Sequence, residues 1–523
     1  MMEPPNLYPS NREPVYASNV VATSQPLAAQ AGIDILKKGG NAVDAAIATA
    51  ITLTVVEPCA NGIGSDAFAI VKDKDSLHGI NGSGKSPALM PTEIDGDIPS
   101  VGWLPVTVPG AVSTWSSLHK RFGNLPFETL FDAAVEYASN GFLLSPQTAV
   151  GFERGATRYT SCEEWKKTFL VNGKVPKAGT LLKLPDHAET LKDIASTHGE
   201  SFYRGALADE MDKASVEQGG YLRKEDLETH QPIWIDPLSI NVDGNTFSEL
   251  PPNGQGIAAL ITLKILLELG VDLSKVDEPE VLHAQIEAMK CAFADTHAFV
   301  ADPESCGRCE ELLDDARIEK HAQSITSVAS GIREEVIPKY SSTVYLAVGD
   351  ASGMQVSFIQ SNFEGFGSGV VIPNTGIAMQ NRGRGFSVDA THPNAIGPSK
   401  RPFHTIIPAF IELAQGGNVP MGVMGGPMQP QGHVQVACRL LFAHQNPQTA
   451  LDAPRWRVDA GRTVHLESGF DTKVYAALKE MGHDVHVATE RTVQFGGGQV
   501  VYQLQDGYVA GSDSRRDGQA IGF

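Results

Sequence analysis

The chain has few cysteines and few basic residues for its length. Six cysteines in 523 residues cannot form the disulfide framework of a small secreted domain. Cys306 and Cys309 form a C-x-x-C pair that could be redox-active or half of a zinc site. No second pair accompanies it, so two free thiols in an acidic loop are the simpler expectation. Because 41 Lys and Arg face 61 Asp and Glu, we expect neither nucleic acid nor an anionic membrane as a partner.

Long apolar segments and several catalytic motifs are also missing. No run approaches the roughly 18 uncharged apolar residues of a membrane-spanning helix, and the first residues are polar and proline-rich with no apolar signal core. These absences predict a cytoplasmic protein. There is no G-x-S-x-G elbow between a strand and a helix, and no H-E-x-x-H among the 15 histidines. We therefore expect no metal and no cofactor.

One stretch, GINGSGKS at 79–86, matches the phosphate-binding pattern G-x-x-x-x-G-K-[ST]. The pattern binds phosphate only when a helix starts at the Lys-Ser pair, because backbone N–H groups must point at the ligand. Five prolines between 87 and 109 leave no uninterrupted helix there. The sequence therefore predicts a plain glycine turn. Tight ATP binding that is lost in Lys85→Ala would revive the nucleotide hypothesis.

Hydrophobic periodicity predicts a layered α/β chain. Two helices are expected within 25–57, split by Gly39-Gly40, and the second is apolar nearly all round, as for a helix buried between layers. Further helices are expected between 110 and 230 and between 256 and 302. After about residue 340 the chain becomes strand-rich, with predicted strands in STVYLAVGD, GMQVSFIQS, GSGVVIPN, TGIAMQN, HTIIPAFIEL, GVMGG and GGGQVVYQLQDGYVAG and one helix in HVQVACRLLFAHQ. Helices outside and paired sheets inside fit these elements.

The first of these strands begins at a candidate nucleophile. Ser341, Ser342 and Thr343 follow the charged stretch IREEVIPKY. If the chain is cut before a hydroxyl residue, the freed α-amine can act as the base for the oxygen of the same residue. By itself, a threonine that opens a strand is ordinarily just a β-former.

Eight separated segments resemble the gamma-glutamyltransferase family, in family order and spacing, from about residue 20 to the C-terminus. They are PLAAQAGIDILKKGGNAVDAAIATAITLTVVEP, TVPGAVSTWSSLHKRFGNLPF, ELPPNGQGIAAL, IEAMKCAFADTHAFVADP, STVYLAVGD, GFGSGVVIPNTGIAMQNRGRGFS, LDAPRWR and SDSRRDGQAIGF. The resemblance implies an N-terminal-nucleophile hydrolase fold, a four-layer αββα sandwich. It also implies a proenzyme that cuts itself in front of a threonine.

The resemblance assigns the reacting residues. Thr343 matches the nucleophile, so the cleavage site lies between Ser342 and Thr343. Cleavage would leave a large subunit, 1–342, and a small subunit, 343–523, intertwined in one domain. Gly425 and Gly426 match the oxyanion-hole glycines, whose N–H groups stabilise a tetrahedral intermediate.

The substrate pocket departs from the family pattern. Transferases of the family hold the α-carboxylate of the glutamyl group with an arginine and two serines, and its α-amine with an acidic pair. Those positions hold Ser83, then His404 and Thr405, then Arg384 and Gly385. Since the carboxylate for an ammonium is missing while arginines are added, we expect a substrate with a carboxylate and no neighbouring ammonium. The predicted substrate-binding residues are Ser361, Asn362, Arg382, Arg384, His404, Thr405 and Ser83.

The leading hypothesis is hydrolysis of a small carboxylate-bearing amide, gamma-glutamyl-like or oxamate-like, through an acyl-enzyme. The pocket variant is similar to the subgroup of gamma-glutamyltransferase-like hydrolases that includes oxamate amidohydrolase and class IV cephalosporin acylases. A true gamma-glutamyltransferase or glutathione hydrolase remains an alternative, in which His404, Thr405 and Arg382 clamp the substrate differently. The other alternative is an uncleaved, non-catalytic binding protein. A dimer of cleaved heterodimers is also left open.

Overall fold

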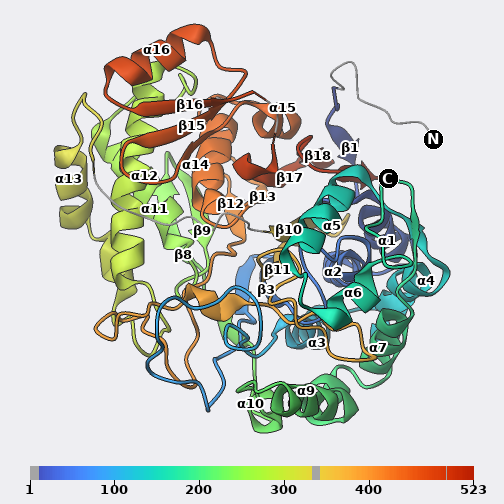
Figure 1. Ribbon diagram of the computed structural model, residues 1–523. Helices are drawn as coiled ribbons and strands as arrows, with labels where there is room; N and C mark the ends of the chain where they lie inside the picture. The colour runs from blue at the N-terminus through green and yellow to red at the C-terminus, as the bar shows by residue number, and fades with distance from the viewer. Residues whose placement is uncertain (1–10, 332–341, 490–491) are drawn as a thin grey trace.

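Two facing antiparallel sheets lie between two layers of helices in the computed structural model, which describes residues 11–331, 342–489 and 492–523 (Figure 1). The first sheet has the strand order β1 (Val15–Ala17), β18 (Gly507–Ser512), β17 (Gly497–Leu504), β13 (Asn418–Met424), β12 (Ala409–Glu412), β9 (Asn245–Glu249) and β8 (Leu238–Val242). The second has the order β19 (Gln519–Gly522), β2 (Val20–Thr23), β10 (Ser342–Gly349), β11 (Gln355–Phe363), β3 (Asp66–Asp73), β4 (Ser76–Asn81) and β7 (Ile233–Ile235).

Each sheet takes strands from both sides of the bond between Ser342 and Thr343. In the second sheet, β10 pairs with β2 on one side and with β11 on the other, and β11 pairs in turn with β3. In the first sheet, β12 pairs with β9 and β13. The two predicted subunits are therefore interleaved strand by strand, so neither could keep a complete sheet without the other.

The helices form an outer layer on each sheet. Over the second sheet lie α1 (Pro26–Lys37), α2 (Ala42–Val56), α3 (Ala111–Phe122), α4 (Asp132–Asn140), α5 (Pro146–Arg158), α6 (Glu163–Phe169) and α7 (Pro185–Ser196), followed by α8 (Glu200–Arg204), α9 (Ala206–Glu217) and α10 (Lys224–Glu228). Over the first sheet lie α11 (Ile257–Leu269), α12 (Pro279–Phe299) and α14 (Met428–Leu441), with α13 (Asp315–Ser324), α15 (Pro447–Asp452) and α16 (Thr472–Glu480) beside them. Two small sheets complete the fold, one of β14 (Trp456–Val458), β15 (Thr463–Glu467) and β16 (Asp484–Ala488), the other of β5 (Phe142–Leu143) and β6 (Leu181–Leu182).

Three hydrophobic clusters fill the three spaces between the layers. One, which includes Ile47 and Val71, joins α1 and α2 to the second sheet. One joins α11, α12 and α14 to the first sheet. A third lies between the sheets and includes Phe68, Tyr345 and Phe410. Burial of apolar area between four successive layers confirms the predicted αββα sandwich.

Most predicted elements are confirmed, and two are wrong. The apolar helix α2 is buried along its whole length, as its composition predicts. The strands predicted in GSGVVIPN and TGIAMQN are instead turns with isolated bridges, such as Val371 to Ala378. Gly369, Asn374 and Gly376 all have positive φ there, which breaks the extended backbone that β-formers would otherwise favour. The stretch IREEVIPKY and Ser341 lie outside the described residues.

None of the helices within the described ranges combines the length and the apolar character needed to cross a membrane.

Candidate active site

Thr343 lies at an irregularity in a central strand. Ser342 is opposite Phe363 in β11, whereas Val344 is opposite Gln360, so the register shifts between them. Such a bulge interrupts the regular alternation of side chains and is common beside active sites. Thr343 is buried, with 1% of its surface exposed. The bond that the sequence predicts to be cut is therefore the one place where the pairing of β10 and β11 is irregular.

Ser361 connects the predicted nucleophile with the carbonyl that it would attack. The Thr343 hydroxyl donates a hydrogen bond to Ser361 Oγ over 3.1 Å. Ser361 Oγ in turn donates to the carbonyl oxygen of Ser342 over 2.9 Å and accepts from the Phe363 N–H at 2.8 Å. A donor on the Ser342 carbonyl draws electron density from its carbon. Ser361 thus holds the nucleophile and polarises its target at once.

Arg382 supports Ser361 from behind. Its Nη2 donates to Ser361 Oγ over 3.2 Å and its Nη1 donates to Thr405 Oγ1 over 2.8 Å. The guanidinium lies over the Phe363 ring, 4.4 Å from the centroid, and the side chain is fully buried. We call Thr343, Ser361, Arg382 and Thr405 the inner cluster. Sequence reasoning predicted each of its members and the structure brings them together.

A buried hydrogen bond between a histidine and an aspartate lies next to the inner cluster. His404 Nε2 is 3.1 Å from Asp66 Oδ2, and both side chains are fully buried. The Ile406 N–H donates to His404 Nδ1, so the proton is on Nε2 and is donated to Asp66. Burial, followed by the charge of Arg382, holds the pKa of His404 well below its usual range. His404 is therefore a neutral positioning group, and within the described residues no hydrogen bond joins it to Thr343.

The charges around Arg382 keep it cationic. Burial lowers the pKa of Arg382 to about 9, and the carboxylates of Asp66 and Glu364 oppose that change. Burial raises the pKa of Asp66 to about 7, against the opposing effects of Arg382 and of the Gly110 N–H. At neutral pH Arg382 keeps its proton, so a permanent positive charge lies behind Ser361.

Gly425 and Gly426 form the turn between β13 and α14. Their φ angles are 136° and 59°, and a Cβ on Gly425 would lie 3.2 Å from the Cα of Gly496. Gln255 Nε2 donates to the carbonyl oxygens of Gly426, over 2.9 Å, and of Thr405, over 2.6 Å, and so ties the turn to the inner cluster. Among the described residues, neither glycine N–H donates a hydrogen bond to another protein group. Both remain available to an oxyanion.

Two other predicted substrate-binding residues, Arg384 and Ser83, bond to protein groups outside the inner cluster. Arg384 Nη1 is 2.7 Å from Glu364 Oε1, and Glu364 also bonds Arg158 and, over 2.9 Å, Asn381. The charge of Arg384 is thereby neutralised outside the inner cluster. Ser83 donates its hydroxyl to Asn81 Oδ1 over 2.7 Å and is fully buried.

The Asn362 side chain is bonded to a serine of the protein. Asn362 Oδ1 accepts a hydrogen bond from Ser65 over 2.7 Å, while its Nδ2 is buried without a partner among the described residues.

The GINGSGKS stretch is the end of β4 and the loop after it, and no helix begins before α3. Lys85 pairs with Glu304 at 3.3 Å. The loop therefore lacks the helix N-terminus that a phosphate site requires, as predicted.

A cavity of about 390 Å³ opens beside the bond predicted to be cut, because both Ser342 and Gly425 line it. Its charged lining residues are four arginines, Arg154, Arg158, Arg457 and Arg516, and no acidic side chain of the described ranges lines it. We call it the arginine cavity. Sequence reasoning missed these arginines. The i, i+4 spacing of Arg154 and Arg158 on one helix face was a signal for only half of the set.

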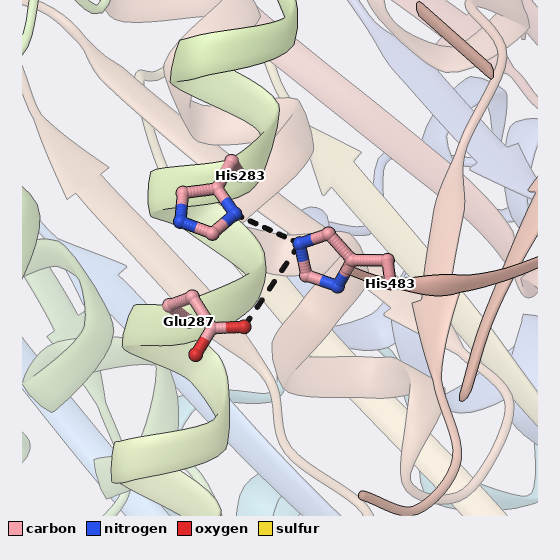
Figure 2. Close-up of side chains that lie close together, drawn as sticks. All are labelled: His283, Glu287 and His483. Atoms are coloured by element: carbon pink, nitrogen blue, oxygen red, sulfur yellow. Dashed lines mark hydrogen bonds and ion pairs between the residues drawn. The ribbon is translucent and has the colours of Figure 1, made fainter. Parts of the chain in front are cut away.

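One group of side chains within the described ranges has the geometry of a metal site. His283, Glu287 and His483 place one possible ligand atom each within 4.8 Å of one another (Figure 2). His283 Nδ1 is 2.8 Å from His483 Nε2, Lys290 donates to Glu287 Oε1 over 2.7 Å, and the Ser330 hydroxyl donates to Glu287 Oε2 over 2.5 Å. Because each of these atoms already has a protein partner, we assign the group a structural role. The i, i+4 spacing on α12 was its only sequence signal.

Facing sheets between helical layers, with a threonine at the start of a central strand, define the class of N-terminal-nucleophile hydrolases. A crystal structure of cephalosporin acylase from Bacillus halodurans has the same fold, with a TM-score of 0.95 and 44% identity over 100% of this chain and 99% of that one. The Gamma-glutamyltranspeptidase family model matches residues 28–523. The chain therefore belongs to the gamma-glutamyltranspeptidase family.

Two curated relatives match almost end to end. The Glutathione hydrolase-like YwrD proenzyme of Bacillus subtilis is 34% identical over 98% of this chain and 100% of its own length. The Oxamate amidohydrolase proenzyme of Klebsiella pneumoniae is 33% identical over 95% of this chain and 97% of its own. The resemblance predicted from the sequence, including its subgroup, is confirmed.

Proposed function

We propose that this protein is a self-cleaving threonine amidohydrolase. The observation that carries the proposal is the pair of hydrogen bonds by which Ser361 Oγ joins the Thr343 hydroxyl to the Ser342 carbonyl. A nucleophile and its target held by one group are arranged for attack within a single molecule. The names of the relatives YwrD and oxamate amidohydrolase, both proenzymes, support the same reaction.

The first reaction is cleavage of the chain itself. The Thr343 oxygen attacks the Ser342 carbonyl carbon, and the Ser361 hydroxyl, which already donates to that carbonyl oxygen, stabilises the oxyanion, while the Gly425 and Gly426 N–H groups remain for a substrate oxyanion. The C–N bond then breaks, the hydroxyl proton passes to the nitrogen, and an ester remains between Ser342 and the Thr343 oxygen. Water hydrolyses the ester. The products are subunits 1–342 and 343–523, the second with a free α-amine.

The second reaction repeats this chemistry on a substrate amide. The freed α-amine of Thr343 takes the hydroxyl proton as the oxygen attacks the amide carbonyl. The amine or ammonia leaves with that proton, and water releases the acid from the acyl-enzyme. The cavity beside Ser342 is lined by four arginines and, among the described residues, by no acidic side chain. We therefore propose a small carboxylate-bearing amide as the substrate.

Glutathione hydrolysis is the second candidate, favoured by the family and by the name of the Bacillus subtilis relative. It would require recognition of the α-ammonium next to the carboxylate. No acidic side chain among the described residues lines the arginine cavity, and Arg384 occupies the position where the transferases carry an acidic residue. Rates on glutathione comparable with those on simple dicarboxylic monoamides would favour this candidate.

The experiment is an intact-mass spectrum of the purified protein beside Thr343→Ala. We expect two fragments that meet between Ser342 and Thr343 in the wild type, and one full-length chain in the variant. Thr343→Ser is the matched control, because it keeps the hydroxyl and should still cleave. A single full-length wild-type mass after long incubation would overturn the proposal and favour a non-catalytic binding protein.

A further inference from the structure

We propose that the arginine cavity is the acyl-binding subsite and that Arg154 and Arg516 bind the remote carboxylate of a linear dicarboxylic acid monoamide. The inference rests on the proposed function for the reaction, but the anion site itself can be tested without catalysis. It moves carboxylate recognition away from the inner cluster, where sequence reasoning placed it.

The position of Ser342 relates the cavity to the acyl side of the reaction. In self-cleavage, the carbonyl of Ser342 is the acyl carbonyl that Thr343 attacks. A substrate carbonyl must take a similar position, within reach of the Thr343 oxygen and of the Ser361 hydroxyl. Since Ser342 and Gly425 both line the cavity, it is the space that adjoins that carbonyl. The cavity therefore receives the acyl chain.

Two of the four arginines already have counter-ions. Arg158 pairs with Glu364. Arg457 binds both carboxylate oxygens of Asp459, with Nε at 2.6 Å and Nη2 at 2.7 Å. Such bidentate pairs leave little charge for a ligand. These two arginines shape the cavity wall.

The other two arginines lack a close carboxylate among the described residues. Arg154 is exposed and forms no ion pair with another described residue. Arg516 Nη1 is 3.8 Å from Glu57 Oε1, beyond hydrogen-bond distance. Its Nη2 is 2.9 Å from the sulfur of Met424, and its Nε is buried without a partner in the described part of the chain. The Nη1 of Arg516 donates no hydrogen bond to a described residue, so it, rather than the buried Nε, is the group that favours a carboxylate or another oxyanion.

The carboxyl group of Glu57 is a weak counter-ion for Arg516. Burial raises the pKa of Glu57 to about 7, and the charge of Arg516 and the hydroxyl of Ser24 only partly oppose that effect. The Ser24 hydroxyl is 2.5 Å from Glu57 Oε2. Near neutral pH a large fraction of Glu57 carries its proton, which leaves the charge of Arg516 uncompensated.

The size and the walls of the cavity define the acyl chain. The volume of about 390 Å³ leaves room for an acyl chain of several carbon atoms. Val150, Phe366, Met428 and Val493 provide apolar parts of the same lining. Methylene groups between the amide carbonyl and the carboxylate suit such walls. An oxamate-like acyl group, whose carboxylate adjoins the carbonyl, would leave most of the cavity unfilled.

The inner cluster is a poorer site for the carboxylate. Both terminal nitrogens of Arg382 already donate to Ser361 and Thr405, and the side chain is fully buried and does not line the cavity. A carboxylate there would have to displace the group that positions Thr343.

The activity test compares two anilides that differ only in the remote carboxylate. The cleaved enzyme is assayed on the mono-4-nitroanilide of glutaric acid and on the 4-nitroanilide of butyric acid. We expect the wild type to prefer the glutaric compound in kcat/KM, and Arg516→Gln combined with Arg154→Gln to reduce that preference at least tenfold. Arg516→Lys should fall between them, because it keeps the charge without the planar fork. Arg308→Gln is the control, since Arg308 is a surface arginine paired with Glu311.

A binding test separates this inference from the proposed function. Calorimetric titration with glutarate uses the purified protein, whether or not it has cleaved. We expect binding in the wild type and in Arg308→Gln, and its loss in Arg516→Gln with an unchanged melting temperature. Cleavage without glutarate binding would overturn the subsite and leave the proposed function standing. Glutarate binding to a protein that never cleaves would overturn the function and leave the subsite standing. An unchanged preference in the double variant would also overturn the subsite.

Discussion

The arginine of the inner cluster and the arginines of the cavity differ in how far the protein already binds their hydrogen-bond donors. In the inner cluster, Arg382 is fully buried and its terminal nitrogens are bonded to Ser361 and Thr405. In the cavity, Arg516 has no carboxylate within hydrogen-bond distance and its Nη1 donates no hydrogen bond, as far as the described residues extend. A guanidinium whose donors are taken by the protein acts on the chain itself. One whose donors are free is available to a ligand.

The difference also has an energetic meaning. A charge in a low-dielectric interior is costly unless it is paired, and removing its partner costs more than the pair contributes. Arg382 lies among Asp66, Glu364 and Ser361, so folding depends on it. Arg154 and Arg516 line the cavity, where the carboxylate of a ligand would pair with their charge, so ligand binding depends on them. Changes in the inner cluster should therefore affect both stability and cleavage, whereas changes in the cavity should affect substrate choice.

The largest expected effect is that of Arg382→Met. It removes the buried cation next to Asp66 and the donors to Ser361 and Thr405, and breaking a buried charged network costs about 3–5 kcal/mol in comparable cases, whereas Glu364 keeps Arg158 and Arg384. We expect a marked loss of unfolding free energy in urea together with slow or absent self-cleavage. Arg384→Met is the control, since Arg384 shares Glu364 but its side chain is 32% exposed. Wild-type stability and cleavage in Arg382→Met would contradict the assigned role.

Ser361→Ala should slow self-cleavage with a smaller effect on stability. It removes the donor to the Ser342 carbonyl and the acceptor of the Thr343 hydroxyl. Loss of one donor to a developing oxyanion costs about 10²–10³ in rate in other hydrolases. The time course of the two fragments after synthesis measures this effect. Ser357→Ala, on the same strand and bonded to Tyr345, should cleave as the wild type does. Equal rates for the two variants would disprove the role of Ser361.

Gly425→Ala tests the glycine turn. Its φ of 136°, and the distance of 3.2 Å between the Gly496 Cα and the place that an added methyl group would take, make any side chain strained. Such strain costs about 1–3 kcal/mol. We expect a displaced turn and at least tenfold slower turnover of the anilide by the cleaved enzyme. Gly416→Ala has a similar backbone penalty, with φ of 90°, but lies at an open turn and should turn over normally. Similar kinetics in both variants would remove the turn from the mechanism.

The smallest expected effect is a pH dependence of glutarate binding. The pKa of Glu57 is raised to about 7, so Glu57 is neutral below that pH and ionised above it. Ionised Glu57 competes for Arg516, and Asp517 adds further negative charge nearby. We expect binding several-fold tighter at pH 6 than at pH 8, measured by calorimetry, and a flatter profile in Glu57→Gln. A steep profile that persists in Glu57→Gln would assign it to another group.

The sequence predicted the layers and the nucleophile but not the cavity. Periodicity suffices for α2 and β10, because burial repeats at fixed intervals along a single element. Thr343 and Gly425 were found because their motifs are local. The arginine cavity brings Arg154 and Arg516 together from distant parts of the chain, and no local pattern encodes such a meeting. The bulge at Thr343 likewise depends on the partner strand, which a single segment does not specify.

Hydrogen bonds of His283 and Glu287 fix the chain at Thr326 and Ser330, shortly before the predicted cleavage site. His283 Nε2 is 2.7 Å from the carbonyl oxygen of Thr326, and the Ser330 N–H donates to Glu287 Oε2 over 3.0 Å. A cut after Ser342 would leave a new chain end attached at Ser330 through residues 331–342. Such a segment spans at most about 40 Å. Self-cleavage would thus create a carboxylate at Ser342, a residue that lines the arginine cavity before the cut, on a chain end whose reach from Ser330 is limited.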